Sequence, residues 1–341
     1  MIRYRKNFFL KHSLLLILLL TFSGFIYASS PSIEFEEVAP GIFVHQGEHL
    51  DVDETYHGDI ANIGFIVGEE SIAVIDSGGS LKIGNKLKTA IRKFSKLPVR
   101  YVINTHVHLD HIYGNASFVG ENVDFIGHVE LPKAMALRKE FYERINLEYL
   151  DVPNDQSIQI APNILIKPNE SKIFDLGNRK IKVTAYSIAH TKTDVTIEDL
   201  KTKTLWAGDL LFTERTPVID GDIHGFIDVI DKILMLDIDL VIPGHGTPTK
   251  KWEEAFLKEQ NYFKLLRDEV RLAIDNDQDL QLTIDTAGQS ESEKWELFDI
   301  QNGRNIKQNI SYDGVGVTPD ISMTCLCLES NYLPFLQPSI L

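Results

Sequence analysis

The chain has 341 residues, of which 43% are hydrophobic and 24% are charged, a composition typical of a globular protein with an ordinary core. Its formal net charge of −15 would repel phosphate backbones and anionic lipid, so we expect no nucleic-acid partner. The two cysteines, Cys325 and Cys327, are one residue apart and too few for a disulfide framework.

The first 28 residues have the pattern of a secretory signal peptide. Basic residues without any acidic one lie between Met1 and Lys11, and an apolar run from Ser13 leads to Ala28, where small residues suit a signal peptidase. The run is short for a membrane span of roughly 20 residues, so we expect cleavage and no stable membrane span in the mature chain. The mature protein is therefore expected to be periplasmic or secreted.

Apolar segments in the first half predict short strands and one helix. Helical spacing is found in Lys82–Phe94, which places four apolar residues on one face. Strands are expected, in chain order, at Ile33–Val38, Ile42–His45, Ile60–Val67, Ile72–Asp76 and Val99–Ile103. The third and fourth of these are separated by Gly68-Glu-Glu-Ser71, which is typical of a hairpin.

The second half resembles the first in kind, and a polar segment separates the two. Asp151–Asn169 is rich in Pro and Asn, which predicts a surface loop. Beyond it we expect two strands within Ile173–Ile188, further strands at Val195–Glu198, Thr204–Ala207 and Leu240–Ile242, and helices at Ile223–Leu236 and Trp252–Ile274. Strands that pair in sequence, with helices closing each half, predict an α+β fold: a four-layer αββα sandwich.

These segments divide the chain into four parts. We expect a signal peptide over residues 1–28, the sandwich domain over 29–252 and a helical extension over 253–310. Residues 311–341 form a tail without a clear hydrophobic period, for which disorder, an unusual extension and a reading-frame error are the alternatives.

The strongest chemical signal in the chain follows the predicted strand that ends at Ile103. Within six residues it contains His106, His108, Asp110 and His111. A single histidine is more often structural, but three with an aspartate at this spacing are hard to explain by core packing. Imidazole and carboxylate groups suit zinc or another first-row metal, so we predict a metal site at this strand end.

Six residues cannot surround a metal ion by themselves, and further ligands are found at other strand ends. His190 follows a predicted strand, Asp209 follows another within Trp-Ala-Gly-Asp, and His245 lies in Pro-Gly-His-Gly. Loops that follow strands gather at one edge of a sandwich, so we expect these three side chains to complete the site.

Taken together, His-x-His-x-Asp-His, the later His, Gly-Asp and Gly-His-Gly resemble the metallo-β-lactamase superfamily. Asp76, in Val-Ile-Asp-Ser-Gly, matches the early structural aspartate of that family, and the resemblance covers roughly Ile33–Trp252. Four segments resemble more narrowly the periplasmic branch called quinoprotein relay system zinc metallohydrolases: His57–Val67, Val102–His106, Gly208–Phe212 and Arg215–Gly221.

The resemblance implies a two-metal site whose cofactors would be two Zn²⁺ ions, with iron or manganese as alternatives. The first ion would be bound by His106, His108 and His190. The second would be bound by Asp110, His111 and His245, and Asp209 would bridge both. This bridging carboxylate resembles the glyoxalase II pattern; lactamases of the superfamily often have cysteine or serine there, which lowers the odds of lactamase activity.

Such a site predicts hydrolysis of an ester, thioester or amide by a hydroxide that bridges the metals. Asp110 would be catalytic, orienting this nucleophile and accepting its proton. Four further side chains are candidates for the substrate pocket, with exposed, capping or packing roles as the alternatives: His57, Tyr113, Asn115 and His224.

Several functions stay open at this point. Among enzymes these are a class B β-lactamase, a glyoxalase II-like thioesterase and an iron-dependent sulfur dioxygenase. A different class is a metal-binding accessory or maturation factor for a periplasmic quinoprotein. The expected partners are a small-molecule substrate and a periplasmic quinoprotein dehydrogenase system. Metal analysis would separate most of these alternatives.

Overall fold

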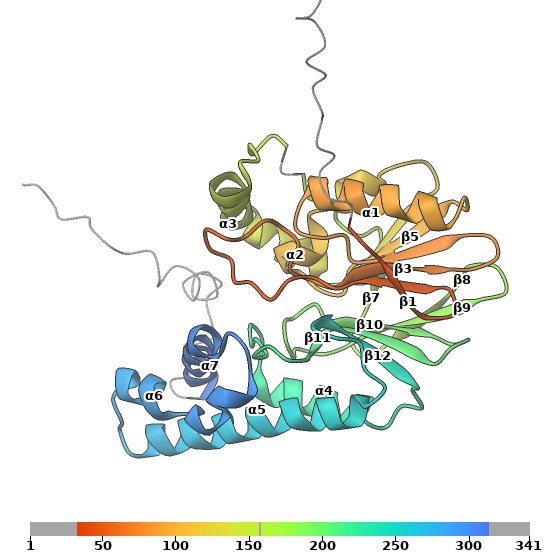
Figure 1. Cartoon of the computed structure of the whole chain (residues 1–341). Coiled ribbons are helices and arrows are strands. Elements are labelled where there is room, and N and C mark those ends of the chain that lie inside the picture. The colour runs from red at the N-terminus through yellow and green to blue at the C-terminus, as the bar shows by residue number, and fades with distance from the viewer. Residues whose placement is uncertain (1–32, 157, 314–341) are drawn as a thin grey trace, which may run out of the picture. The chain divides into compact units, whose positions relative to one another are not determined.

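Two β-sheets lie face to face in the computed structural model, which describes residues 33–156 and 158–313 (Figure 1). The signal-peptide pattern and residues 314–341 of the tail lie outside the described residues. The first sheet contains, in hydrogen-bonded order, β1 (Glu36–Ala39), β2 (Ile42–His45), β3 (Ile63–Val67), β4 (Ile72–Ile75), β5 (Val99–Ile103), β6 (Asp124–His128) and β7 (Ile164–Ile166). The second, also in spatial order, contains β12 (Leu240–His245), β11 (Thr204–Phe212), β10 (Val195–Asp199), β9 (Lys180–Ala185) and β8 (Ser171–Asp175).

Each sheet combines antiparallel and parallel pairs. β1 to β4 pair antiparallel and β4 to β7 pair parallel. In the second sheet β8 to β11 pair antiparallel, and β11 and β12 pair parallel. Because parallel strands end at the same sheet edge, β5 and its neighbours end together, and so do β11 and β12.

The space between the sheets is filled by side chains that alternate along the strands. In β4, Ala73 and Ile75 point to this inner core, whereas Ile72 and Val74 pack on the opposite face. In the second sheet Ile197 and Trp206 face the same inner core. Both faces of the strands β4, β11 and β12 are buried, which explains why these strands are nearly continuous apolar runs in the sequence.

Helices cover the two outer faces (Figure 1). α1 (Leu81–Phe94) packs Ile83, Leu87 and Ile91 on the first sheet, and the Ser80 hydroxyl caps it by accepting from the Ile83 amide. On the second sheet, α4 (Ile223–Ile233) and α5 (Trp252–Asp275) form the outer layer. The αββα sandwich predicted from the sequence is confirmed.

The helical extension shares its core with the second sheet and the helices on it. After α5 it contains α6 (Leu280–Thr286), the 3₁₀ helix η2 (Gln289–Lys294) and α7 (Phe298–Asp313). Phe226 of α4, Phe263 of α5 and Ile306 of α7 belong to one buried cluster. Within the described residues, no helix is both long enough and apolar enough to cross a membrane.

The segment between the two sheets differs from the expectation. Asp151–Asn169 is not entirely loop, because β7 lies within it and pairs with β6. The preceding 20-residue helix α3 (Leu131–Leu150) has no clear sequence signal, since Glu143 and Asn146 are buried in it while Leu137 and Leu147 are exposed. Polar residues at buried positions and apolar ones at exposed positions hide the helical period.

Candidate metal centre

Loops and strand ends from both sheets bring all seven predicted ligands to one edge of the sandwich. The loop after β5 carries His106 and His108, and the short helix α2 (Leu109–Ile112) carries Asp110 and His111. The others lie between β9 and β10 (His190), within β11 (Asp209) and at the end of β12 (His245). They form two groups, each with ligand atoms within 4.8 Å of one another: His106, His108, His190 and Asp209; and Asp110, His111 and His245.

The centre contains buried polar atoms that the protein leaves without a hydrogen bond. His111 Nε2 and Asp209 Oδ1 are both buried and unsatisfied, although they lie only 3.2 Å apart. Buried polar atoms in proteins nearly always have a partner. A cation between them would satisfy both atoms, and nitrogen and oxygen donors in this combination fit Zn²⁺.

The proton positions on three histidines follow from what surrounds their outward nitrogens. His190 donates Nδ1–H to the Val218 carbonyl at 2.8 Å, and His245 donates Nδ1–H to the Ile60 carbonyl at 2.7 Å. His108 is turned the other way, and its Nε2–H donates to Asp220 Oδ2 at 2.9 Å. Each ring therefore presents its unprotonated nitrogen to the centre, as metal ligands in proteins do.

Asp76 orients the remaining two imidazole rings, those of His106 and His111. Its carboxylate accepts from the Thr105 amide at 2.8 Å, from the Thr105 hydroxyl at 2.7 Å and from His111 Nδ1–H at 2.8 Å. Because the Thr105 hydroxyl is committed to Asp76, its oxygen accepts from His106 Nδ1–H at 3.0 Å. Asp76 is thus outside both ligand groups but orients His106 and His111.

Asp209 lies between the two groups. Its Oδ2 is 3.5 Å from His106 Nε2 and 3.3 Å from His190 Nε2, both in the first group. Its Oδ1 is 3.2 Å from His111 Nε2, and its Oδ2 is 3.4 Å from His245 Nε2, both in the second. One carboxylate therefore faces both donor sets.

The electrostatics of the centre favour neutral imidazoles beside ionised carboxylates. Burial lowers the pKa of His190 to about 4, and burial together with the neighbouring His111 lowers the pKa of His106 well below its ordinary value. Burial alone would raise the pKa of Asp209, but the surrounding histidines hold it well below its ordinary value. His111 behaves differently, because Asp110, Asp209 and Asp76 outweigh its burial and raise its pKa. Positive charge is thus stabilised where the three carboxylates converge.

Two glycines allow Asp209 to occupy this place. A Cβ on Gly244 would lie 1.9 Å from Asp209 Oδ1, so no larger residue fits beside the carboxylate. Gly208 has φ +55°, and a Cβ there would lie 2.6 Å from Thr105 Cβ. The register of β11 against β12 shifts on both sides of Gly208, so β11 continues to Phe212 rather than ending near Ala207 as expected.

Asp220 orients His108 and is a residue to which sequence reasoning did not assign a role. Besides His108, it accepts from Arg138 Nη2 of α3 at 2.7 Å. Arg138 and the His108 hydrogen bond hold the pKa of Asp220 at about 2 against the effect of burial. Asp220 lies in Ile-Asp-Gly, within the segment Arg215–Gly221 that was noted only for its resemblance to the quinoprotein relay branch. No sequence pattern near Arg138 links that residue to Asp220.

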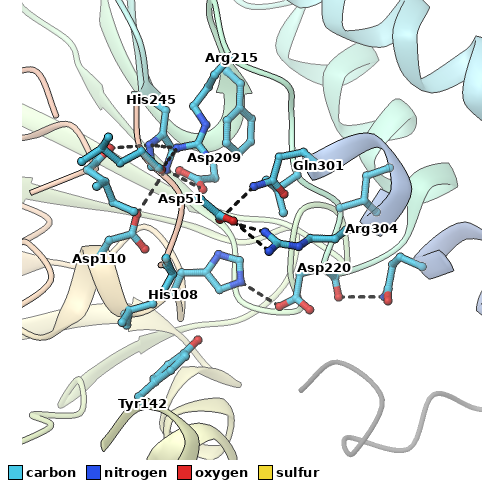
Figure 2. A pocket seen from close by; sticks show the side chains of 18 of the residues that line it. Asp51, His108, Asp110, Tyr142, Asp209, Arg215, Asp220, His245, Gln301 and Arg304 are labelled. Carbon is cyan, nitrogen blue, oxygen red and sulfur yellow. Dashed lines mark hydrogen bonds and ion pairs between the residues drawn. The ribbon is translucent and has the colours of Figure 1, made fainter. Parts of the chain in front are cut away.

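A cavity opens beside the ligands and is lined from four parts of the chain (Figure 2). The loop between β2 and β3 supplies Leu50, Asp51, Val52 and Ile60, and α3 supplies Arg138, Phe141 and Tyr142. The segment after β11 supplies Arg215, Val218, Ile219 and Asp220, and α7 supplies Gln301, Arg304 and Gln308. Figure 2 shows Arg304 and Gln301 reaching across to Asp51.

The four residues predicted for the substrate pocket do not line this cavity. His57 is exposed and lies 3.4 Å from Glu48, and His224 is exposed at the start of α4. Tyr113 and Asn115 are buried instead: the Tyr113 hydroxyl accepts from Gln159 at 2.9 Å, and Asn115 bonds to Asn104 and Ser77. Tyr113 and Asn115 thus follow the ligand loop in the sequence, but their side chains pack behind it.

Comparison with known proteins identifies the family. The family model described as Metallo-beta-lactamase superfamily matches residues 57–245. A linear primary-alkylsulfatase from Pseudomonas sp. (strain ATCC 19151) is 33% identical over 66 residues, which are 19% of this chain and only 12% of that protein.

Solved structures share the fold at low sequence identity. The metallo-beta-lactamase from Pontibacter korlensis is 18% identical with a TM-score of 0.52, over 68% of this chain and 98% of that one. The inverting sec-alkylsulfatase Pisa1 from Pseudomonas sp. is 16% identical with a TM-score of 0.57, over 89% of this chain and 51% of that one. This chain thus corresponds to about half of the alkylsulfatase chain.

Proposed function

The chain belongs to the metallo-beta-lactamase superfamily, and from this premise we propose that it is a zinc-dependent hydrolase of an ester, thioester or amide. The observation that carries the proposal is the donor set: five imidazoles held by outward hydrogen bonds, and two carboxylates, converging on one buried point. A site that had lost its function would not be expected to keep every ligand and its orienting partner.

The proposed roles follow the two groups of ligand atoms. His106, His108 and His190 would hold one ion, and Asp110, His111 and His245 the other. Asp209 faces both groups and would bridge them. Two bound zinc ions would supply an activated water and polarise the substrate carbonyl.

Asp110 would act on the nucleophile as well as on the second ion. Its Oδ2 lies 3.4 Å from both His111 Nε2 and His245 Nε2, and its side chain also lines the cavity. The neighbouring histidines hold its pKa far below its ordinary value, so it is ionised and able to accept a hydrogen bond from water. A carboxylate so placed can orient a water and receive its proton.

The bridging aspartate favours a thioester over a β-lactam as the first substrate to test, because lactamases of this superfamily often have cysteine or serine at that position. Elemental analysis should find close to two zinc ions per chain, and the zinc-loaded protein should hydrolyse a member of a panel of thioesters, esters and β-lactams. One iron and no zinc would favour a dioxygenase, and absence of turnover across the panel would favour an accessory factor.

A second candidate is hydrolysis of a sulfate ester. The alkylsulfatase likeness supports it, because it extends over 89% of the chain whereas the lactamase likeness covers 68%. A primary and a secondary alkyl sulfate therefore belong in the same panel. Release of sulfate without hydrolysis of any carbonyl substrate would replace the first proposal by this one.

We also propose export and a link to a periplasmic quinoprotein dehydrogenase system. The support is the basic and apolar start of the chain and the four segments that resemble the quinoprotein relay branch. Sequencing of the mature protein from its native host should find Ser29 near the N-terminus. A mature chain in the cytoplasm that still begins at Met1 would contradict this proposal.

A further inference from the structure

Helix α7 buries several amide side chains where a packed helix would ordinarily bury apolar ones. Four of these amides are at most 5% exposed: Gln301, Asn302, Asn305 and Gln308. Burying an amide costs free energy unless its polar atoms find partners, so the partners show what the helix holds. α7 lies beyond residues 57–245, which are the part of the chain that the family model matches.

Asn305 binds the backbone on both sides of Val218. Its Oδ1 accepts from the Ile219 amide at 2.9 Å, and its Nδ2 donates to the Pro217 carbonyl at 2.7 Å. The same Nδ2 also donates to the Tyr262 hydroxyl at 3.0 Å. Because a backbone amide can only donate and a carbonyl can only accept, these partners fix the orientation of the side-chain amide and occupy its oxygen and both N–H groups.

The peptide unit that Asn305 binds meets a metal ligand on its other side. The Val218 carbonyl and the Ile219 amide belong to one planar group, in which oxygen and hydrogen point in opposite directions. His190 Nδ1–H donates to that carbonyl at 2.8 Å. By accepting from the amide, Asn305 fixes the plane of this peptide and polarises its carbonyl into a stronger acceptor. A stronger acceptor raises the basicity of His190 Nε2, which faces Asp209.

A second amide of α7 supports the residue that orients His108. Gln308 Nε2 donates to the carbonyls of Asp220 at 3.2 Å and Gly221 at 3.1 Å. The Asp220 side chain accepts from His108 Nε2–H, and Figure 2 shows the two groups facing each other. The Asp220 amide also donates to the His190 carbonyl at 3.0 Å. α7 therefore holds the short segment that orients two ligands of the first group.

We propose that Asn305 is a positioning residue of the first ligand group, which acts on His190 through the Val218–Ile219 peptide, so that zinc binding and the docking of α7 stabilise each other. The inference rests on the proposed function only for the zinc ion. Coupling of this kind is reciprocal, so the factor by which docked α7 raises zinc affinity is also the factor by which zinc favours docking. The helical extension is then a working part of the metal centre.

The first test compares two buried asparagines of α7 that hold different groups. Asn305→Leu leaves the Ile219 amide without an acceptor, and calorimetric titration of metal-free protein should show about 10–100-fold weaker zinc binding to one of two ions. Asn302→Leu is the matched control, because Asn302 is comparably buried but bonds to the Ala287 carbonyl and the Tyr262 hydroxyl. It should lower the melting temperature by a similar amount and leave zinc affinity unchanged.

A conservative variant and a resonance of the ligand itself separate positioning from stability. Asn305→Asp keeps an acceptor for the Ile219 amide and should restore part of the lost affinity. At saturating zinc, the His190 Nδ1–H resonance of ¹⁵N-histidine-labelled protein reports on the strength of its bond to Val218. It should move upfield in Asn305→Leu and stay in place in Asn302→Leu. A loss of stability alone would not move it.

A third measurement uses the wild type and stands even if Asn305→Leu does not fold. Amide hydrogen exchange is followed with and without saturating zinc. Reciprocity predicts that zinc slows exchange in α7 by about the same 10–100-fold. The reference is α1, which packs on the first sheet, and its exchange should slow less.

Three results would overturn the inference: unchanged zinc affinity in Asn305→Leu, an equal loss in Asn302→Leu, or exchange in α7 that zinc slows no more than exchange in α1. A wild type without affinity for zinc would overturn it at once. Turnover on the substrate panel separates the inference from the proposed function. Weaker zinc binding in Asn305→Leu without hydrolysis by the wild type would refute the hydrolase and keep the positioning role. Hydrolysis by the wild type with unchanged zinc affinity in Asn305→Leu would do the reverse.

Discussion

Asp110 is the residue at which metal binding and proton transfer can be separated. Asp110→Asn keeps the shape of the side chain but gives a weaker ligand that cannot accept a proton. We expect turnover to fall by about 10²–10⁴, the range usual for loss of a general base, with little change in melting temperature in excess zinc. Steady-state kinetics and thermal unfolding on the same preparations measure both quantities.

Two further variants serve as controls for Asp110. His106→Ala should instead empty the first ligand group and lower the zinc content. Asp228→Asn, at an exposed position of α4, should leave turnover and zinc content unchanged. Turnover that is unaffected in Asp110→Asn would remove this residue from the mechanism.

Asp220 acts through His108 and therefore tests positioning rather than chemistry. Asp220→Ala removes the acceptor that holds His108 Nε2–H and leaves Arg138 without its carboxylate. Loss of such a partner typically weakens metal affinity by about 10–100-fold. Competition with a zinc-binding dye should show this loss for one of two zinc ions. Unchanged affinity of both ions would mean that packing alone orients His108.

At the scale of elements, an ion pair ties the β2–β3 loop to α7 across the cavity. Asp51 and Arg304 are 253 positions apart, and their side chains are only 10% and 14% exposed. Arg304 holds the pKa of Asp51 below its ordinary value although burial opposes this. The pair thus fixes the wall that α7 contributes.

A double-mutant cycle on Asp51→Asn and Arg304→Gln measures the strength of this ion pair. We expect a coupling free energy of about 1.5–3 kcal/mol, as for hydrogen bonds to charged groups. The exposed pair Lys203 and Asp237 is a matched control, for which a much smaller coupling free energy is usual. Both single variants at the cavity should raise KM more than they lower kcat. Coupling no larger than in the control pair would show that α7 is held by its apolar contacts.

For the whole molecule, the buried histidines predict how stability depends on pH. The pKa of His190 is about 4 in the folded chain, lowered from 6.5 by burial. Between these values the unfolded chain binds a proton at His190 that the folded chain does not. The free energy of unfolding of the metal-free protein should therefore fall as the pH falls from about 6.5 to about 4. His106 and His245, whose pKa values burial also lowers, add to the effect with the same sign, whereas Asp194 and Glu259, whose pKa values burial raises, oppose it.

Denaturant unfolding in the presence of a chelator at several pH values in this window checks the prediction. His190→Gln should give a shallower dependence. His45→Gln should leave the dependence in this window unchanged, because Asp59 raises the pKa of His45 despite burial, so the effect of His45 on stability falls above pH 6.5. Stability independent of pH across the window would contradict this account.

The sequence by itself identified the two-layer sheet core and the seven residues that the structure brings together at the candidate metal centre. Strands with both faces buried are nearly continuous apolar runs in the sequence and are easily recognised, as in β3 and β4. The ligands were equally visible because histidine and aspartate directly after an apolar strand have few explanations other than chemistry. Both are local patterns, so they can be found without knowledge of what packs against them.

Only the tertiary structure decided the cavity and the residues that support the ligands. The helix α3, which contributes Arg138 and Tyr142, buries polar residues and exposes leucines, so its period is hidden in the sequence. Asp51 meets Arg304, and Asp220 meets Arg138, across long stretches of chain. Such pairs are set by how the layers pack, which no local pattern of residues encodes.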